Sequence, residues 1–168
     1  MKSGSWGSLV LLLLAAAVLL RPWESLDGLW EDEPPARAMV VVTRVVDGDT
    51  VEVQLGGAEE DVRYIGVDTP ETVKPGAPVD CFGPQASSFN HRLVERRRVR
   101  LVFGEEQRDV YGRLLAYVYL GDRFVNAELV RRGLARTLTI PPNDRFAERL
   151  KGLEIAAARA GRGLWGAC

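Results

Sequence analysis

Residues 39–55 read MVVVTRVVDGDTVEVQL and decide the fold of this chain. Two runs rich in β-branched residues, Met39–Val46 and Thr50–Leu55, flank the tight-turn sequence Asp47-Gly48-Asp49. This pattern is typical of a strand, a sharp reversal and a second strand. After two glycines, a third run at Asp61–Val67 has the same character. The stretch therefore predicts three short strands that pair as a meander.

Along the rest of the chain, prolines and glycines that interrupt regular structure alternate with segments of helical or strand periodicity. Residues 68–82 contain three prolines, Pro70, Pro75 and Pro78, which predict a loop. Helices are expected from Gly83 to about Arg96–Arg98, over Asn126–Arg132 and from Asp144 to Ala160, and strands over Val99–Phe103 and Arg113–Leu120. Five short strands, with one helix inserted after the third, predict a mainly β (α+β) fold: a five-stranded Greek-key barrel of the OB type with three helices.

The composition of the chain limits the kinds of functional site that it can form. The 168 residues carry a formal net charge of −1, but residues 21–38 are acidic and the rest from Met39 onward is close to neutral. Nucleic-acid binding would therefore depend on local arginine clusters rather than on a global field. His91 is the only histidine. Sites built on several histidines are thereby excluded, and hydrolysis would need carboxylates, arginines and a hard metal.

The N-terminus has the features of a targeting segment. Lys2 precedes the unbroken apolar run Leu9–Leu20, which is short for a membrane span and fits a secretory signal or an uncleaved anchor. A buried core helix is the third alternative. We expect residues 1–20 to be this signal, 21–38 an acidic linker with prolines, and 39–168 the globular domain. The domain would be exported, and membrane contact would occur only through the N-terminal segment if it stays uncleaved.

Two cysteines complete the expectation of export. Cys81 lies in the loop before the first helix and Cys168 is the last residue. Since exported proteins retain disulfides, we predict that Cys81 and Cys168 pair and tie the C-terminal tail to that loop.

Acidic residues cluster at two predicted strand ends. Asp47 and Asp49 occupy the first turn, and Asp68 and Glu71 follow the third strand. Oxygen-rich loops at neighbouring strand ends suit a hard cation. The alternative is that these residues serve only as turn formers.

Two arginines lie in strands beside these acids. Arg63 precedes Asp68 by five residues, and Arg113 begins a later strand. Arginines in a barrel wall need anionic partners. A phosphate held between a metal and two guanidiniums would be such a partner, whereas structural salt bridges are the alternative.

Four motifs, in order and with matching intervals from about Met39 to Trp165, resemble the staphylococcal nuclease (thermonuclease) family. They are Asp47-Gly48-Asp49-Thr50, Arg63-Tyr64-Ile65-Gly66-Val67-Asp68-Thr69-Pro70-Glu71, Tyr111-Gly112-Arg113-Leu114-Leu115-Ala116-Tyr117 and the segment Val125–Ala135. The resemblance implies an OB-fold barrel that hydrolyses DNA and RNA, single-stranded or unpaired, with Ca²⁺ as cofactor. It implies no protein partner.

The resemblance also implies a role for each matching residue. Asp49 and Asp68 would bind calcium through their carboxylates and Thr69 through its carbonyl, with Asp47 as a supporting acid. Glu71 would be the general base or orient the attacking water. Arg63 and Arg113 would bind the phosphodiester and stabilise the transition state, and Tyr111 would hydrogen-bond a terminal phosphate.

Two departures from the family separate catalysis from base binding. Val110 stands where a lysine is expected, and residues 137–141 contain no aromatic residue where the family places tyrosines against the base. We therefore expect weaker, strongly salt-dependent substrate binding. The rival hypothesis is a noncatalytic OB-fold module that binds nucleic acid or protein, but such a module should have lost some of the acids or arginines. A structural envelope protein is a third hypothesis, supported only by the anchor.

Overall fold

The computed structural model describes residues 36–72 and 79–168, and one compact unit comprises Pro35–Cys168. The proposed signal and linker, residues 1–20 and most of 21–38, lie outside the described residues. The strands are β1 (Arg37–Val45), β2 (Thr50–Leu55), β3 (Ala58–Tyr64), β4 (Gly66–Asp68), β5 (Arg98–Arg108), β6 (Leu114–Leu120), β7 (Arg123–Phe124) and β8 (Arg136–Leu138). The helices are α2 (Gly83–Val94), α3 (Val125–Arg131), α4 (Ala147–Arg159) and the single turn α5 (Leu164–Ala167).

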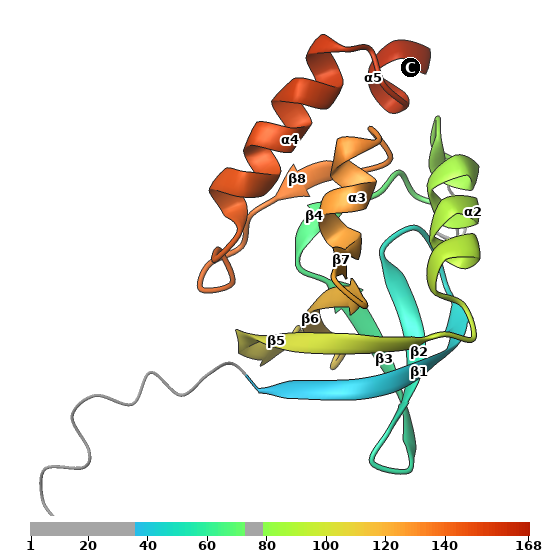
Figure 1. The fold of residues 1–168 in the computed structure, drawn as a ribbon, viewed down its shortest axis with the longest axis vertical. Coiled ribbons are helices and arrows are strands. Elements are labelled where there is room, and N and C mark those ends of the chain that lie inside the picture. The colour runs from blue at the N-terminus through green and yellow to red at the C-terminus, as the bar shows by residue number, and fades with distance from the viewer. Residues whose placement is uncertain (1–35, 73–78) are drawn as a thin grey trace, which may run out of the picture. The chain divides into compact units, whose positions relative to one another are not determined.

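Strands β1, β2, β3, β5 and β6 form the predicted OB-type barrel. The meander β1–β2–β3 is antiparallel, and β5 pairs antiparallel with both β1 and β6. The parallel pairing of β3 with β6 closes the barrel. The helices gather at one end of it (Figure 1). The predicted fold class, including α2 inserted after the meander, is confirmed.

Valine alternation explains why these segments become strands. Val51 and Val53 of β2 are completely buried, whereas Gln54 between Val53 and the turn is exposed. On β1, Val40 and Val42 face the same core, with Val41 exposed between them. Burial of one face of each strand fixes the register of the meander, since a slip by one residue would turn every valine outward.

The predicted third strand, Asp61–Val67, is in fact two strands that bend between them. β3 ends at Tyr64, and Gly66 begins β4 with a φ of +80°, which L side chains rarely adopt. A Cβ on Gly66 would also lie 2.6 Å from the side chain of Leu150. The bend separates β4 from the barrel and pairs it with β8, so that Asp68 lies opposite Arg136.

Several other element boundaries also differ from the predictions. Helix α2 ends at Val94, because Glu95 is extended and Arg96 has a φ of +57°. Arg96–Arg98 therefore form a turn and the start of β5 rather than the end of the helix. The last helix begins at Ala147, three residues after Asp144, since a turn in which the Ala147 amide donates to the Asp144 carbonyl comes first. Among the described residues, no helix is long and apolar enough to span a membrane.

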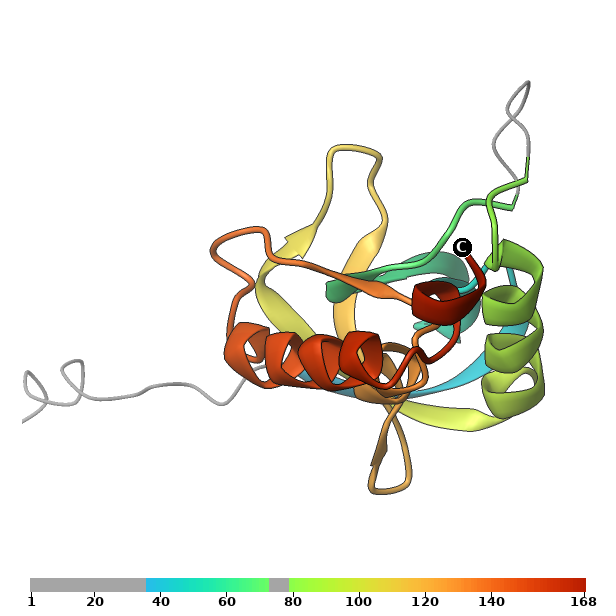
Figure 2. The ribbon, with the colours of Figure 1, turned by 90° about the horizontal axis from the view of Figure 1, so that it is seen from above.

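A disulfide joins the two ends of the helical layer. Cys81, just before α2, is bonded to Cys168, just after α5. Figure 2 shows α5 between α4 and α2, and the disulfide links its end to the residues just before α2. Leu164 of α5 is buried, and its amide donates to the Gly133 carbonyl at 2.9 Å. The C-terminal residues are therefore fixed to the domain by covalent and noncovalent contacts.

Reduction of this disulfide is expected to lower the free energy of unfolding by about 2–4 kcal/mol, because it releases a long loop in the unfolded chain. The two cysteines are 87 positions apart. Urea unfolding with and without a phosphine reductant measures the effect. The double variant Cys81→Ser/Cys168→Ser is the control and should unfold at the lower urea concentration in both conditions. Equal midpoints for the oxidised and reduced wild type would contradict the prediction.

Candidate active site

A polar cavity of about 200 Å³ lies where the β1–β2 turn meets the segment after β4. The fold brings both predicted acidic loops and both predicted arginines to this one place. Its lining comprises Asp47, Asp49, Thr50, Arg63, Asp68, Thr69, Glu71 and Arg113.

Asp49 is the buried centre of the site. Its side chain is almost inaccessible, and one carboxylate oxygen accepts hydrogen bonds from the Thr69 amide at 2.7 Å and the Thr69 hydroxyl at 2.9 Å. Burial raises the pKa of Asp49 to about 6; the cation Arg63 opposes this rise, and the neighbouring Asp47 adds to it. The site therefore contains a carboxylate whose negative charge the protein leaves incompletely compensated.

Gly48 allows the two acidic loops to touch. A Cβ at this position would lie 2.6 Å from the Thr69 hydroxyl oxygen, so a larger residue would push the loops apart. The Asp47 carboxylate accepts a hydrogen bond from the Asp49 amide at 3.0 Å and shapes the turn. Thus Asp47 orients the backbone of Asp49, in keeping with a supporting position beside it.

Arg63 spans the bend between β3 and β4. Its Nε lies 3.2 Å from Asp49 Oδ1, and one terminal nitrogen lies 3.0 Å from Asp68 Oδ1. The other terminal nitrogen donates to the carbonyls of Tyr64 and Val67. The alternation of side chains along a straight strand did not place Arg63 and Asp68 together; the bend does.

Arg113 reaches the same cavity from the start of β6. Its guanidinium pairs with Asp109 at 2.7 Å, and the Asp109 carboxylate also accepts the amides of Tyr111 and Arg113. Burial acts to raise the pKa of Asp109, but the hydrogen bonds and charge of Arg113 outweigh it and lower that pKa below its ordinary value. Sequence reasoning missed Asp109 as the residue that orients Arg113.

Tyr111 and Glu71 line different cavities. The Tyr111 ring is exposed, with the Arg113 guanidinium 5.4 Å from its centroid. One Glu71 carboxylate oxygen accepts the Thr72 amide at 2.8 Å. Each residue predicted for catalysis, substrate or calcium binding except Tyr111 lines the polar cavity, and Tyr111 lines the cavity next to it.

Two buried asparagines that sequence reasoning did not single out support these loops. Asn90 of α2 donates to the Asp47 carbonyl at 3.1 Å and accepts from the Tyr64 hydroxyl at 3.1 Å. Asn126 of α3 donates to the Ile65 carbonyl at 2.8 Å, at the β3–β4 bend. The available signal was a polar residue on the apolar face of a helix, since Asn90 follows Ala86 by four positions.

The donor set suits a divalent cation. Four carboxylates and two guanidiniums line the cavity, a formal charge of −2. Among the described residues, no three Asp, Glu, His or Cys side chains are close enough to hold a metal by themselves. A hard cation here would therefore need backbone oxygen and water in addition to carboxylates, which is a common coordination for calcium.

A second cavity of about 310 Å³ adjoins the first and shares Arg63 and Arg113 with it. Its wall includes the aliphatic side chains of Leu138 and Ile140 and the ring of Tyr111. Leu138 and Ile140 fall within the segment 137–141, so the part of the wall that this segment forms is aliphatic.

Comparisons with known proteins match most of the chain. Residues 61–167 match the model of a family described as staphylococcal nuclease homologue. The chain is 39% identical to a thermonuclease of Staphylococcus intermedius, over 92% of this chain and 94% of the relative. It is 43% identical to a thermonuclease of Staphylococcus hyicus, over 74% and 73%. It is also 39% identical to the endonuclease YncB of Bacillus subtilis, over 75% of this chain and 61% of the relative.

Proposed function

Because this chain belongs to the staphylococcal nuclease family, we propose that it is a nuclease which hydrolyses phosphodiester bonds in DNA or RNA with calcium as its cofactor. The observation that carries the proposal is the cavity in which Asp49, Asp68 and Glu71 face Arg63 and Arg113. None of these groups has been lost, which favours catalysis over a noncatalytic binding module.

The proposed reaction uses the side chains of the cavity directly. Glu71 accepts a proton from the water that attacks phosphorus. Arg63 and Arg113 donate to the nonbridging oxygens and stabilise the charge that develops on the five-coordinate phosphorus. The bond from phosphorus to the leaving sugar oxygen breaks, that oxygen takes up a proton from solvent, and Glu71 returns its proton to solvent. Tyr111, at the rim, donates its hydroxyl to a neighbouring terminal phosphate.

Asp49, Asp68 and the carbonyl of Thr69 would hold the calcium ion. When bound, calcium supplies Lewis acidity and a template for the phosphodiester. The support for this assignment is the formal charge of −2 on the cavity lining and the raised pKa of the buried Asp49. Without a divalent cation, the four carboxylates would repel a phosphodiester.

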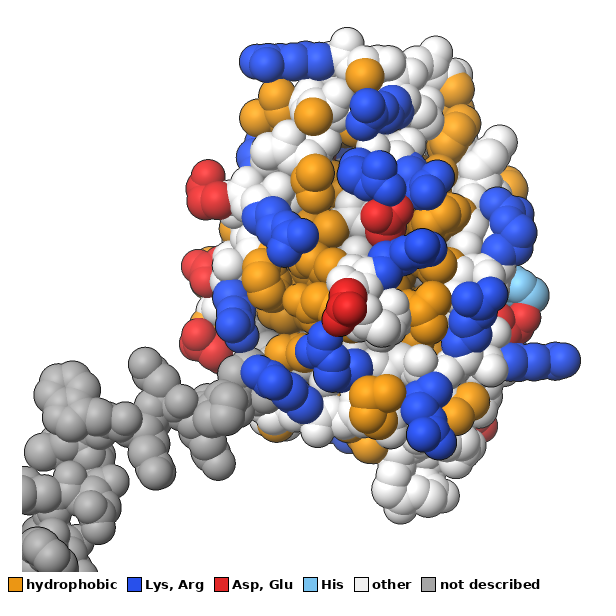
Figure 3. Space-filling view, in the orientation of Figure 1, with side chains coloured by type: hydrophobic (Ala, Val, Ile, Leu, Met, Phe, Trp, Pro, Cys, Tyr) orange, Lys and Arg blue, Asp and Glu red, His pale blue; other side chains and the backbone are white. Residues whose placement is uncertain are grey.

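Local arginine clusters support a polyanionic substrate despite the low net charge. Figure 3 shows that the face formed by α3, α4, β1 and β5 carries many Lys and Arg side chains and few acids. Arg100 stacks on Tyr119, with the guanidinium 4.3 Å from the ring centroid, and Arg149 stacks on Phe124 at 5.5 Å. Stacked guanidiniums stay ordered and keep hydrogen-bond donors for phosphate.

The aliphatic wall of the adjoining cavity favours weak, nonselective base binding. Leu138 and Ile140 give an apolar surface but cannot themselves supply the aromatic stacking that can contribute ~1–3 kcal/mol per base. We therefore propose that phosphate contacts dominate affinity and that binding of single strands weakens steeply with salt.

The experiment that tests the function separates cleavage from binding. The full chain is incubated with a labelled single-stranded oligonucleotide in calcium, and products are separated on a denaturing gel while fluorescence anisotropy reports binding. Calcium-dependent fragmentation that is lost with chelator is expected. Binding without fragmentation would overturn the nuclease and support the binding module.

Calcium is expected to stabilise the folded chain more at pH 7.5 than at pH 5. The pKa of Asp49 in the folded chain, about 6, exceeds its usual value near 3.9 in an unfolded chain, so the stability from its protonation is present at low pH and is lost as pH rises through 6. A cation binds the ionised form and competes with the proton. Thermal unfolding with and without calcium at both pH values measures the two shifts. An equal or larger shift at pH 5 would contradict the prediction, and Asp49→Asn should lose the pH dependence.

We also propose that residues 1–20 direct export, as a cleaved signal or an anchor, and that residues 21–38 link them to the nuclease domain. The support is the basic Lys2, the apolar run after it and the pair Cys81–Cys168, since disulfides persist outside the reducing cytoplasm. Fractionation of producing cells, with detection of a shortened or full-length chain outside the cytoplasm, distinguishes the two alternatives.

A further inference from the structure

Glu71 lies three residues after the end of β4, yet hydrogen bonds fix the backbone on both sides of it. On one side, Thr69 is bound to Asp49 through its amide and its hydroxyl. On the other, Asp80 makes a reciprocal pair of hydrogen bonds with Glu71. The Glu71 amide donates to the Asp80 carboxylate at 3.1 Å, and the Asp80 amide donates to the Glu71 carbonyl at 2.9 Å. Residues 73–78 between them lie outside the described part of the chain.

Asp80 is itself anchored from two directions. Its carbonyl accepts the Gly83 amide at 3.0 Å, which joins it to the start of α2. The next residue, Cys81, is bonded to Cys168. Because Leu164 of α5 is buried against the body of the domain, the disulfide connects Asp80 to a packed element.

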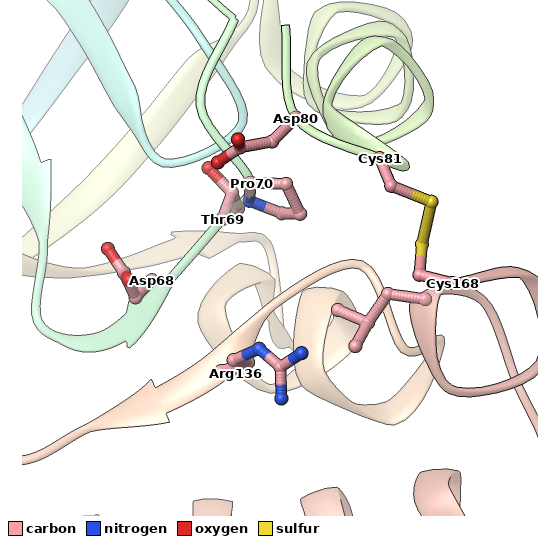
Figure 4. A pocket seen from close by; sticks show the side chains of 8 residues that line it. Asp68, Thr69, Pro70, Asp80, Cys81, Arg136 and Cys168 are labelled. Atoms are coloured by element: carbon pink, nitrogen blue, oxygen red, sulfur yellow. A yellow bond between two sulfur atoms is a disulfide. The ribbon is translucent and has the colours of Figure 1, made fainter. Parts of the chain in front are cut away.

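The start of α2 also packs directly on the backbone of the Glu71 segment. A Cβ on Gly83 would lie 3.0 Å from the carbonyl oxygens of both Pro70 and Glu71. Figure 4 shows Asp80 close to Thr69 and Pro70, with the disulfide forming the far wall of a cavity of about 310 Å³ that Asp68 also lines. The disulfide, Asp80 and Asp68 thus line one cavity.

We propose that Asp80, anchored by the Cys81–Cys168 disulfide, is the positioning residue for Glu71 in the reaction. This inference rests on the proposed function. Asp80 reaches no reacting atom in this assignment; it fixes the backbone from which the Glu71 carboxylate extends toward the attacking water. Positioning of a catalytic group is a large part of rate acceleration, and a displacement of about 1 Å can lower a rate by roughly 100-fold.

Asp80→Ala and Asp80→Asn provide the first test in the full chain. Asp80→Ala removes the acceptor of the Glu71 amide and is expected to lower kcat for oligonucleotide cleavage by about 10- to 100-fold, with little change in KM or in the calcium requirement. Asp80→Asn keeps an acceptor oxygen and should recover most of the rate. Asp122→Ala, an exposed aspartate on the β6–β7 turn, is the matched control.

A double-mutant cycle with Glu71 separates positioning from general destabilisation. If Asp80 acts through Glu71, Asp80→Ala should have no further effect on kcat in a Glu71→Ala background. The same fold loss in both backgrounds would overturn the inference. Thermal unfolding of each variant confirms that the assays are made on folded protein.

Reduction tests the contribution of the disulfide. A phosphine reductant should lower kcat of the wild type in the same direction as Asp80→Ala, and should leave a Cys81→Ala/Cys168→Ala variant unchanged. If wild type is active and Glu71→Ala is slow, but Asp80→Ala and the reduced protein cleave at the wild-type rate, the positioning inference alone is overturned. A wild type that does not cleave overturns the proposed function as well.

Discussion

Replacing Glu71 with glutamine is expected to lower kcat for cleavage of single-stranded DNA by roughly 10²- to 10⁴-fold, the usual contribution of a general base. Glutamine has the same size and can still accept the Thr72 amide at its side-chain oxygen, so the local structure should persist. It cannot accept a proton from water. KM and the calcium requirement should change far less than kcat, because neither arginine nor calcium ligand is altered.

Steady-state kinetics on a labelled oligonucleotide at saturating calcium measure this effect. Glu148→Gln, an exposed glutamate of α4, serves as the matched control and should match wild type. A Glu71→Gln variant that retains kcat within a few fold would remove Glu71 from the chemistry and leave water activation to another group.

Replacing Arg113 with lysine should lower kcat/KM by about 10²- to 10³-fold, the scale seen when one donor to a developing oxyanion is removed. Lysine keeps the charge but lacks the planar fork that binds two phosphate oxygens. The Asp109 carboxylate binds Nε and Nη2 of Arg113, so the other terminal nitrogen of the guanidinium remains for phosphate. A lysine paired with Asp109 would have no equivalent arrangement.

Arg108→Lys is the control for this prediction, since Arg108 makes a comparable two-nitrogen pair with Glu60 but does not line the cavity. Burst or single-turnover rates for both variants, with thermal unfolding as a check on folding, distinguish a catalytic loss from a structural one. Equal losses in Arg108→Lys and Arg113→Lys would show that the effect is not specific to the site.

The barrel could be predicted because its pattern is local. The valines of β1 and β2 alternate, a tight turn joins them, and β2 has the predicted bounds, Thr50–Leu55. The short strands β7 and β8 escaped prediction because two or three residues give no measurable period. The bend at Gly66 was also missed, since it places Gly66 against Leu150, a residue far along the chain.

The site residues could be named, but not the contacts that arrange them. The acids and arginines carry motif signals, whereas the ion pair of Arg63 with Asp49 depends on how β3 leaves the barrel. Likewise Asn90 and Asn126 stand out only as polar residues on apolar helix faces, and the backbone carbonyls that they bind cannot be read from the sequence. Asp80 lies next to a cysteine in a proline-rich loop, and only the fold shows that it faces Glu71.

The dependence of cleavage rate on free calcium, in wild type and in Asp68→Asn, tests the central claim most directly. The Asp68 side chain is 56% exposed, so its replacement should leave the fold intact. We predict that wild-type cleavage saturates with calcium and stops in chelator. We also predict that Asp68→Asn needs a free calcium concentration at least roughly tenfold higher to reach half of its maximal rate. Cleavage that persists in chelator, or identical calcium curves for the two proteins, would contradict the account.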